Sequence, residues 1–291
     1  MLRPVVSIPL PSSAHSRLVR SGYRSLADFS ECQSPPDLPP PADPPSVRSA
    51  WTLACQLHDQ PHFLTHLPAL DALLGSRGLP LAAVCELVAC PSSAIADLCL
   101  HLCAAIQMPP RQMSAVYIDS TGSFSRQAAL SAANSFCRQH PDIHSDIDSS
   151  TMLANIHRLR VYSAHELLAL LGSFDRVCQR LSNVGLLVVN SISWPFLATL
   201  PDDIFRRQSL HAEAARLLTQ IASTHNISVV VVSQAKSALP GGDGPPLPMD
   251  GSAWTRIASN SIAIRGSGGS LDQTSFSLIH SVANPTGTAD P

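Results

Sequence analysis

Residues 84–108, VCELVACPSSAIADLCLHLCAAIQM, decide the fold of this protein. They begin with an apolar run typical of a buried strand, pass through a short turn and end in a helical pattern. Apolar side chains recur there at intervals of three and four residues and form one continuous face: Ile95, Leu98, Cys99, Leu102, Cys103 and Ile106. Ser92 or Ser93 is available as N-cap. The stretch therefore predicts a strand, a tight turn and a helix, a unit that cradles phosphates in nucleotide-binding α/β proteins.

The turn itself lacks the residues that phosphate chemistry requires. A G-x-x-x-x-G-K-[ST] turn uses glycines for close backbone approach, a lysine for the β- and γ-phosphates and a hydroxyl for magnesium. When this motif is laid on the sequence without gaps, its four informative positions are Ala89, Ala94, Ile95 and Ala96. Two interpretations stay open at this point: a degenerate phosphate loop, or an ordinary strand–turn–helix unit that was never one.

The residues that precede this unit resemble a known family. From Leu67 the chain reads LPALDALLGSRGLPLAAVCELV. This resembles the entry into the ATPase core of RecA-type recombinases of the eukaryotic and archaeal branch, where LDxLLGGG-[LI]-xxGxxxEL leads into the phosphate loop. The residues that match as they stand are Leu70, Asp71, Leu73, Leu74, Gly75, Gly78, Glu86 and Leu87.

Composition sets the outer bounds. The 291 residues, 45% of them apolar, supply a core for one large domain with an extension. A net charge of −2 argues against binding to nucleic acid by bulk electrostatics, although a local basic loop remains open. Charged residues are only 14%, against roughly 25% in average soluble domains, which indicates a surface partly covered by a partner. The eight cysteines form no C-x-x-C pair, which favours reduced thiols and an intracellular compartment. We predict no membrane-spanning helix.

Three domains are predicted along the chain. Residues 1–33 form an N-terminal extension, residues 34–48 a proline-rich linker and residues 49–291 the core. The linker holds seven prolines between positions 35 and 45, so it is expected to run as an extended polyproline spacer.

The N-terminal extension has two interpretations. It loosely resembles a remnant of the small helical domain of recombinase paralogues, and that resemblance makes Tyr23 and Phe29 candidate partner-binding residues. The first 27 residues are also rich in arginine and serine and contain no acidic residue, as in a mitochondrial transit peptide. We therefore expect a nuclear location, with the mitochondrion as the alternative.

Two predicted strands end where catalytic residues would stand. Ser114–Asp119 followed by STGSF resembles the recombinase segment YIDTEGTF, in which the glutamate positions the attacking water; Thr121 occupies its place here. Val184–Asn190 resembles the Walker B strand LLVVDSI, whose aspartate holds magnesium; the neutral Asn190 stands in its place. The resemblance thus implies that ATP hydrolysis has been lost.

The next predicted strand, residues 227–234, precedes a possible DNA loop. In the recombinases this strand ends in NQ, at the γ-phosphate sensor and the start of the second DNA loop, and Gln234 keeps the glutamine. Residues 235–251 are rich in glycine and proline, with Lys236 as the only basic residue. The resemblance makes Gln234 and Lys236 possible DNA contacts, and a surface loop is the alternative.

The remaining periodicities complete an alternation of strands and helices. They predict a helix that follows Phe124 and ends at about Gln139, a strand over 158–162, helices over 164–181 and about 201–224, and a pair of strands within 254–265 and 271–279. His140 and His144 flank Asp142 in a polar loop, but we predict no metal site there.

We predict an α/β fold, a RecA-like core with a mostly parallel central sheet flanked by helices. The resemblance implies a non-catalytic accessory paralogue of the eukaryotic recombinase, of the D-type or a fungal relative, without a cofactor. It would assist recombinase filaments on single-stranded DNA as an obligate heteromer with the recombinase or its other paralogues. The alternatives are a pseudo-ATPase subunit of the Elongator complex of transfer-RNA modification and an active recombinase-like ATPase.

Overall fold

The computed structural model describes residues 18, 49–51, 55, 59–89, 94–141, 148–235, 257–265, 271 and 274–281. The chain separates into two compact units, Met1–Gln56 and Leu57–Pro291. The candidate partner-binding residues Tyr23 and Phe29 and the predicted linker lie outside the described residues. Among the helices that the structure describes, none has the length and apolar character to cross a membrane.

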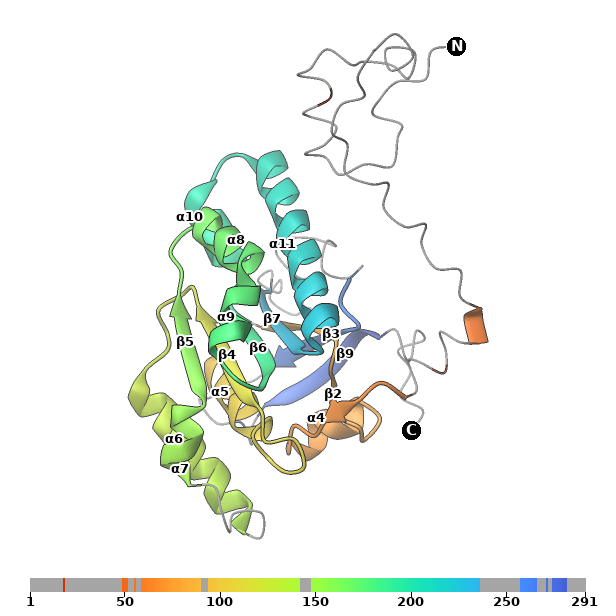
Figure 1. The fold of residues 1–291 in the computed structure, drawn as a ribbon, viewed down its shortest axis with the longest axis vertical. Coiled ribbons are helices and arrows are strands. Elements are labelled where there is room, and N and C mark those ends of the chain that lie inside the picture. Colours follow the sequence, from red (N-terminus) through yellow and green to blue (C-terminus); the bar gives the residue numbers. More distant parts are fainter. Residues whose placement is uncertain are drawn as a thin grey trace, which may run out of the picture. The chain divides into compact units, whose positions relative to one another are not determined.

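A seven-stranded sheet forms the centre of the second unit (Figure 1). The strand order is β5-β4-β6-β7-β3-β8-β9. All neighbours are parallel except β9, which is antiparallel to β8. The strands are β3 (Ala83–Ala89), β4 (Ser114–Asp119), β5 (Ile156–Arg160), β6 (Val184–Asn190), β7 (Ser228–Gln234), β8 (Asn260–Arg265) and β9 (Ser275–Ser281). A separate antiparallel pair joins β1 (His62–Phe63) to β2 (Leu79–Pro80).

Helices cover both faces of the sheet and bury two apolar clusters against it (Figure 1). The helices packed in the first cluster are α4 (Pro68–Leu73), α5 (Ile95–Ala105), α6 (Arg126–Gln139) and α7 (Ser149–Ala154). Those of the second cluster are α8 (Ala164–Gly172), α9 (Phe174–Arg180), α10 (Ser193–Thr199) and α11 (Ile204–His225). Successive strand residues point to opposite faces, so Tyr117 packs in the first cluster and Val116 in the second. The central strands are buried on both sides, which explains their uninterrupted apolar sequences.

The predicted architecture is confirmed, and several local bounds differ. The strand predicted over 158–162 lies at 156–160, because its partner β4 ends at Asp119, opposite Arg160. The helix predicted over 164–181 is broken: Ser173 donates its hydroxyl to the carbonyl oxygen of Ala169, and the preceding Gly172 is a weak helix former. Helix α5 begins after Ala94, which has no capping side chain, and the two serines predicted as caps lie outside the described residues.

Candidate functional site: the carboxyl edge of the sheet

The carboxyl ends of the parallel strands meet at one edge of the sheet, where α/β proteins place their ligands. The residues that end the parallel strands there are Ala89, Asp119, Arg160, Asn190, Gln234 and Arg265. Helix α5 starts close to the end of β3, and the turn between them, residues 90–93, lies outside the described residues.

The start of α5 presents apolar groups where a phosphate loop presents polar ones. Ala89 and Ala94 are buried, and Ala96 is half-buried. The side chain of Ile95 is also half-buried and packs against the first apolar cluster. None of these side chains carries a charge or a hydrogen-bond donor.

The end of β6 is occupied by a neutral hydrogen-bond cluster. The side-chain amide of Asn190 donates to the Tyr117 hydroxyl at 2.6 Å and to the Ser123 hydroxyl at 3.1 Å. Burial raises the pKa of Tyr117 above its usual value, which keeps this hydroxyl protonated even in alkaline solution. Thr121 is exposed and donates to the same Ser123 at 2.9 Å. The structure therefore joins two of the sequence-predicted positions, Asn190 and Thr121, through one serine.

A second set of contacts fastens the end of β4 to the end of β6. The hydroxyl of Ser120 donates to the carbonyl oxygen of Ser191 at 2.6 Å and accepts from its backbone N–H at 2.7 Å. The backbone N–H of Ser120 donates to the carbonyl oxygen of Asn190 at 2.8 Å. Both serines are buried, so the edge is closed here by the chain's own groups.

The end of β4 carries a buried carboxylate that pairs with two arginines. Asp119 is fully buried and lies 2.8 Å from a guanidinium nitrogen of Arg158 and 3.2 Å from one of Arg160. Its carboxylate also accepts the backbone N–H of Gly122 at 2.8 Å. Gly122 has a φ of +82°, and a Cβ there would lie 3.2 Å from the Arg160 guanidinium. The sequence analysis matched Asp119 and Gly122 to a family segment but did not pair them with arginines. The available signal was that Arg158 and Arg160 alternate along the neighbouring strand β5.

The last residue of β7, Gln234, lies beside Ala89 at the end of β3. Gln234 is half-buried and pairs with Ala89 in the parallel register, and the next backbone N–H, of Ala235, donates to the Ala89 carbonyl oxygen at 2.9 Å. Lys236 follows outside the described residues and is the single lysine of the sequence. The chain therefore has no lysine for the phosphate-loop position.

Sequence reasoning matched Glu86 to the family but missed its environment. Glu86 is fully buried in β3, and its carboxylate accepts the hydroxyls of Ser233 at 2.7 Å and Ser261 at 2.8 Å. These bonds link β7, β3 and β8 in the middle of the sheet. Burial, and then the nearby Glu86, raise the pKa of the Cys85 thiol to about 12, so this thiol is unreactive.

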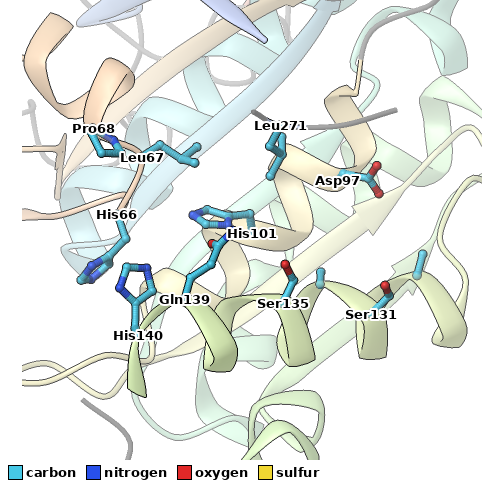
Figure 2. Close-up of a pocket in the computed structure, with 12 residues that line it drawn as sticks. His66, Leu67, Pro68, Asp97, His101, Ser131, Ser135, Gln139, His140 and Leu271 are labelled. Atoms are coloured by element: carbon cyan, nitrogen blue, oxygen red, sulfur yellow. The ribbon is translucent and has the colours of Figure 1, made fainter. Parts of the chain in front are cut away.

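A cavity of about 490 Å³ lies beside α5 and α6, on the face of the first cluster (Figure 2). At one end His66 and His140 lie with ring centres 4.8 Å apart, and His101 and Phe136 lie nearby. Burial lowers the pKa of His101 to about 4, and its ring donates to the Thr65 carbonyl oxygen at 2.8 Å. Within the described residues, no three His, Cys, Asp or Glu side chains are placed to hold a metal ion.

The described residues at the ends of β3 and β6 do not fit a magnesium-bound nucleotide. Magnesium prefers carboxylate and hydroxyl oxygens, whereas the Asn190 amide is engaged with Tyr117 and Ser123. The start of α5 offers Ile95 in place of a cation. The edge can instead serve as a rigid surface on which the side chains of Asp119, Asn190 and Ser120 bond within the protein.

The strand order, the helices on both faces and the motif positions define a RecA-like α/β core. The sequence model of the Rad51 family matches residues 62–258, and the chain belongs to this family. The prediction of a RecA-like recombinase paralogue is thereby confirmed.

Individual relatives are distant. The "DNA repair protein RAD51 homolog 3" of Cricetulus griseus is 25% identical over 89% of this chain and 82% of its own length. The protein of the same name in Dictyostelium discoideum is 26% identical over 68% of this chain and 55% of its own length. The "DNA repair and recombination protein RadA" of Cenarchaeum symbiosum is 25% identical over 60% of this chain and 42% of its own length. Assignment to the D-type subgroup or a fungal relative stays a prediction.

Proposed function

We propose that this chain is a non-catalytic accessory subunit of homologous-recombination DNA repair that assists the assembly or stability of recombinase filaments on single-stranded DNA. Membership of the Rad51 family and the relatives named for DNA repair support the pathway. Nothing in these similarities supports the Elongator alternative.

The observation that carries the non-catalytic part is the hydrogen bond from Asn190 to Tyr117. An aspartate at the end of this strand would offer a metal two anionic oxygens, whereas the amide commits its N–H groups to a buried phenol and a serine. The hydroxyl of Thr121 cannot act as a carboxylate base. Hydrolysis by an unusual loop would need other groups, and we keep it only as the alternative.

The apolar start of α5 also suggests how the subunit is held in a complex. In RecA-type assemblies ATP helps to hold neighbouring cores together, and the apolar start of α5 replaces that polar cavity by a surface that another protein can cover. We propose an obligate heteromer with the recombinase or its other paralogues, in the nucleus, with Tyr23 and Phe29 as docking residues. Contact with single-stranded DNA through Gln234 and Lys236 would be weak and lost at moderate salt, because one lysine releases few counterions.

Affinity purification of the full chain from its own cells, followed by mass spectrometry, tests this proposal. Recovery of the recombinase or its paralogues, reduced when residues 1–48 are deleted, is the expected result. Recovery of Elongator subunits, or a soluble monomer without partners in both forms, would contradict it.

A further inference from the structure

The first two turns of α11 stand away from the apolar core. Ile204 is 55% exposed and Phe205 86% exposed, and Arg206, Gln208 and Ser209 are also exposed. The first fully buried residue of this helix is His211. In Figure 1 this end of α11 is the one next to α10. The segment therefore has little tertiary packing to hold it helical.

Two polar side chains, Asp203 and Arg207, hold these turns. The carboxylate of Asp203 caps the helix by accepting the backbone N–H of Arg206 at 2.9 Å. The guanidinium of Arg207 donates to the carbonyl oxygens of Leu200 and Pro201 at 2.8 and 3.0 Å. Local unfolding of these turns thus requires the loss of the Asp203 cap and of the two Arg207 hydrogen bonds. Segments with so little tertiary packing unfold locally far more readily than the core.

The sequence of the same segment is Arg206-Arg207-Gln208-Ser209-Leu210. Arg206 and Arg207 lie three and two residues before Ser209, whose hydroxyl is exposed. The apolar Leu210 follows Ser209 directly. Protein kinases with an acidic substrate groove bind this pattern, because carboxylates pair with guanidinium groups and a pocket takes the following apolar side chain. Such kinases bind an extended chain, which local opening of the first two turns supplies.

We propose that Ser209 is a phosphorylation site for a serine kinase that selects basic substrates. The Ser209 hydroxyl oxygen attacks the γ-phosphorus of the kinase-bound ATP. A P–O bond forms, the bond to the β-phosphate oxygen breaks, ADP leaves and the hydroxyl proton passes to the kinase's base. This site is independent of the proposed role in recombination.

The modification changes the charge of an exposed surface. A phosphate brings about −1.5 to −2 charges and three acceptor oxygens to the second turn of α11. Arg206 lies one turn before Ser209 and is placed to pair with it, whereas Glu213 lies one turn after it and repels it. Phosphorylation therefore holds the segment helical and gives a negative charge to the surface around Phe205.

The test uses the full chain, ATP and the catalytic subunit of cyclic-AMP-dependent protein kinase as probe, with sites assigned by mass spectrometry. We expect Ser209 to be labelled in the wild type and in S223A, but not in S209A. Ser223 is the matched control, because it is exposed on the same helix without preceding arginines. R206A should slow labelling about tenfold, since it removes a charge-assisted contact.

A second pair of variants tests local opening. D203A removes the cap and should speed labelling of Ser209 about fivefold, whereas D203N retains a capping group and should label at the wild-type rate. Absence of phosphate on Ser209 in the wild type, or labelling of Ser209 that R206A leaves unchanged, would overturn the proposal.

Discussion

Two neighbouring strands of the sheet end in opposite ways. At the end of β4 a buried carboxylate, Asp119, pairs with two arginines of the chain itself. At the end of β6 a neutral amide, Asn190, bonds to the hydroxyls of Tyr117 and Ser123. In both places the polar groups are satisfied within the protein. The difference teaches that the buried charge at the end of β4 is kept where the chain supplies its counter-charge, whereas the end of β6 is built from neutral groups.

The charged end should be the more sensitive of the two. D119N leaves both arginines without their anionic partner and should lower the free energy of unfolding by about 3 kcal/mol, the lower end for a broken buried pair, because Arg158 is 40% exposed. Urea unfolding measures the change.

The control for D119N is E213Q, which removes the exposed pair between Glu213 and Arg216 on α11. An exposed pair of this kind contributes about 0.5 kcal/mol. If D119N lowered the free energy of unfolding no more than E213Q does, the buried pair at the end of β4 would contribute no more than an exposed surface pair. That result would contradict the comparison.

The neutral end should respond to alkaline pH through Tyr117. Burial raises its folded-state pKa, so above pH 10 the unfolded chain loses a proton that the folded chain keeps. The free energy of unfolding should then fall by about 1.4 kcal/mol per pH unit more steeply in the wild type than in Y117F. At pH 7, Y117F should cost about 1 kcal/mol, because Asn190 loses an acceptor. Equal alkaline slopes in the two proteins would mean that the phenol is not held in its neutral form.

Thr121 should have the smallest effect. Its hydroxyl is exposed and donates only to Ser123 among the bonds described here, so T121A should change the free energy of unfolding by less than about 0.5 kcal/mol. A loss above about 1 kcal/mol in the same urea experiment would show that the cluster extends to this surface residue.

The buried strands could be predicted from the sequence. Val184–Asn190 and Ser114–Asp119 have the predicted bounds, because each is an apolar run that ends in a polar residue. The short helices α7 and α10 were missed, since six or seven residues are too few for a helical period to be recognised.

The candidate site was predicted only in part. Sequence similarity located Thr121 and Asn190, but their shared contact with Ser123 depends on the fold, since Ser123 and Asn190 are 67 residues apart. The same holds for Glu86, whose partner Ser233 lies 147 residues away. The histidine end of the cavity likewise assembles residues from three separate segments.

The most direct test of the central claim is ATP turnover by the purified full chain, compared with that of the double variant T121A/N190A. The account predicts no hydrolysis above background in either protein, since both positions lack a carboxylate and Ile95 stands where a lysine would meet the phosphates. Turnover by the wild type that the double variant abolishes would contradict it.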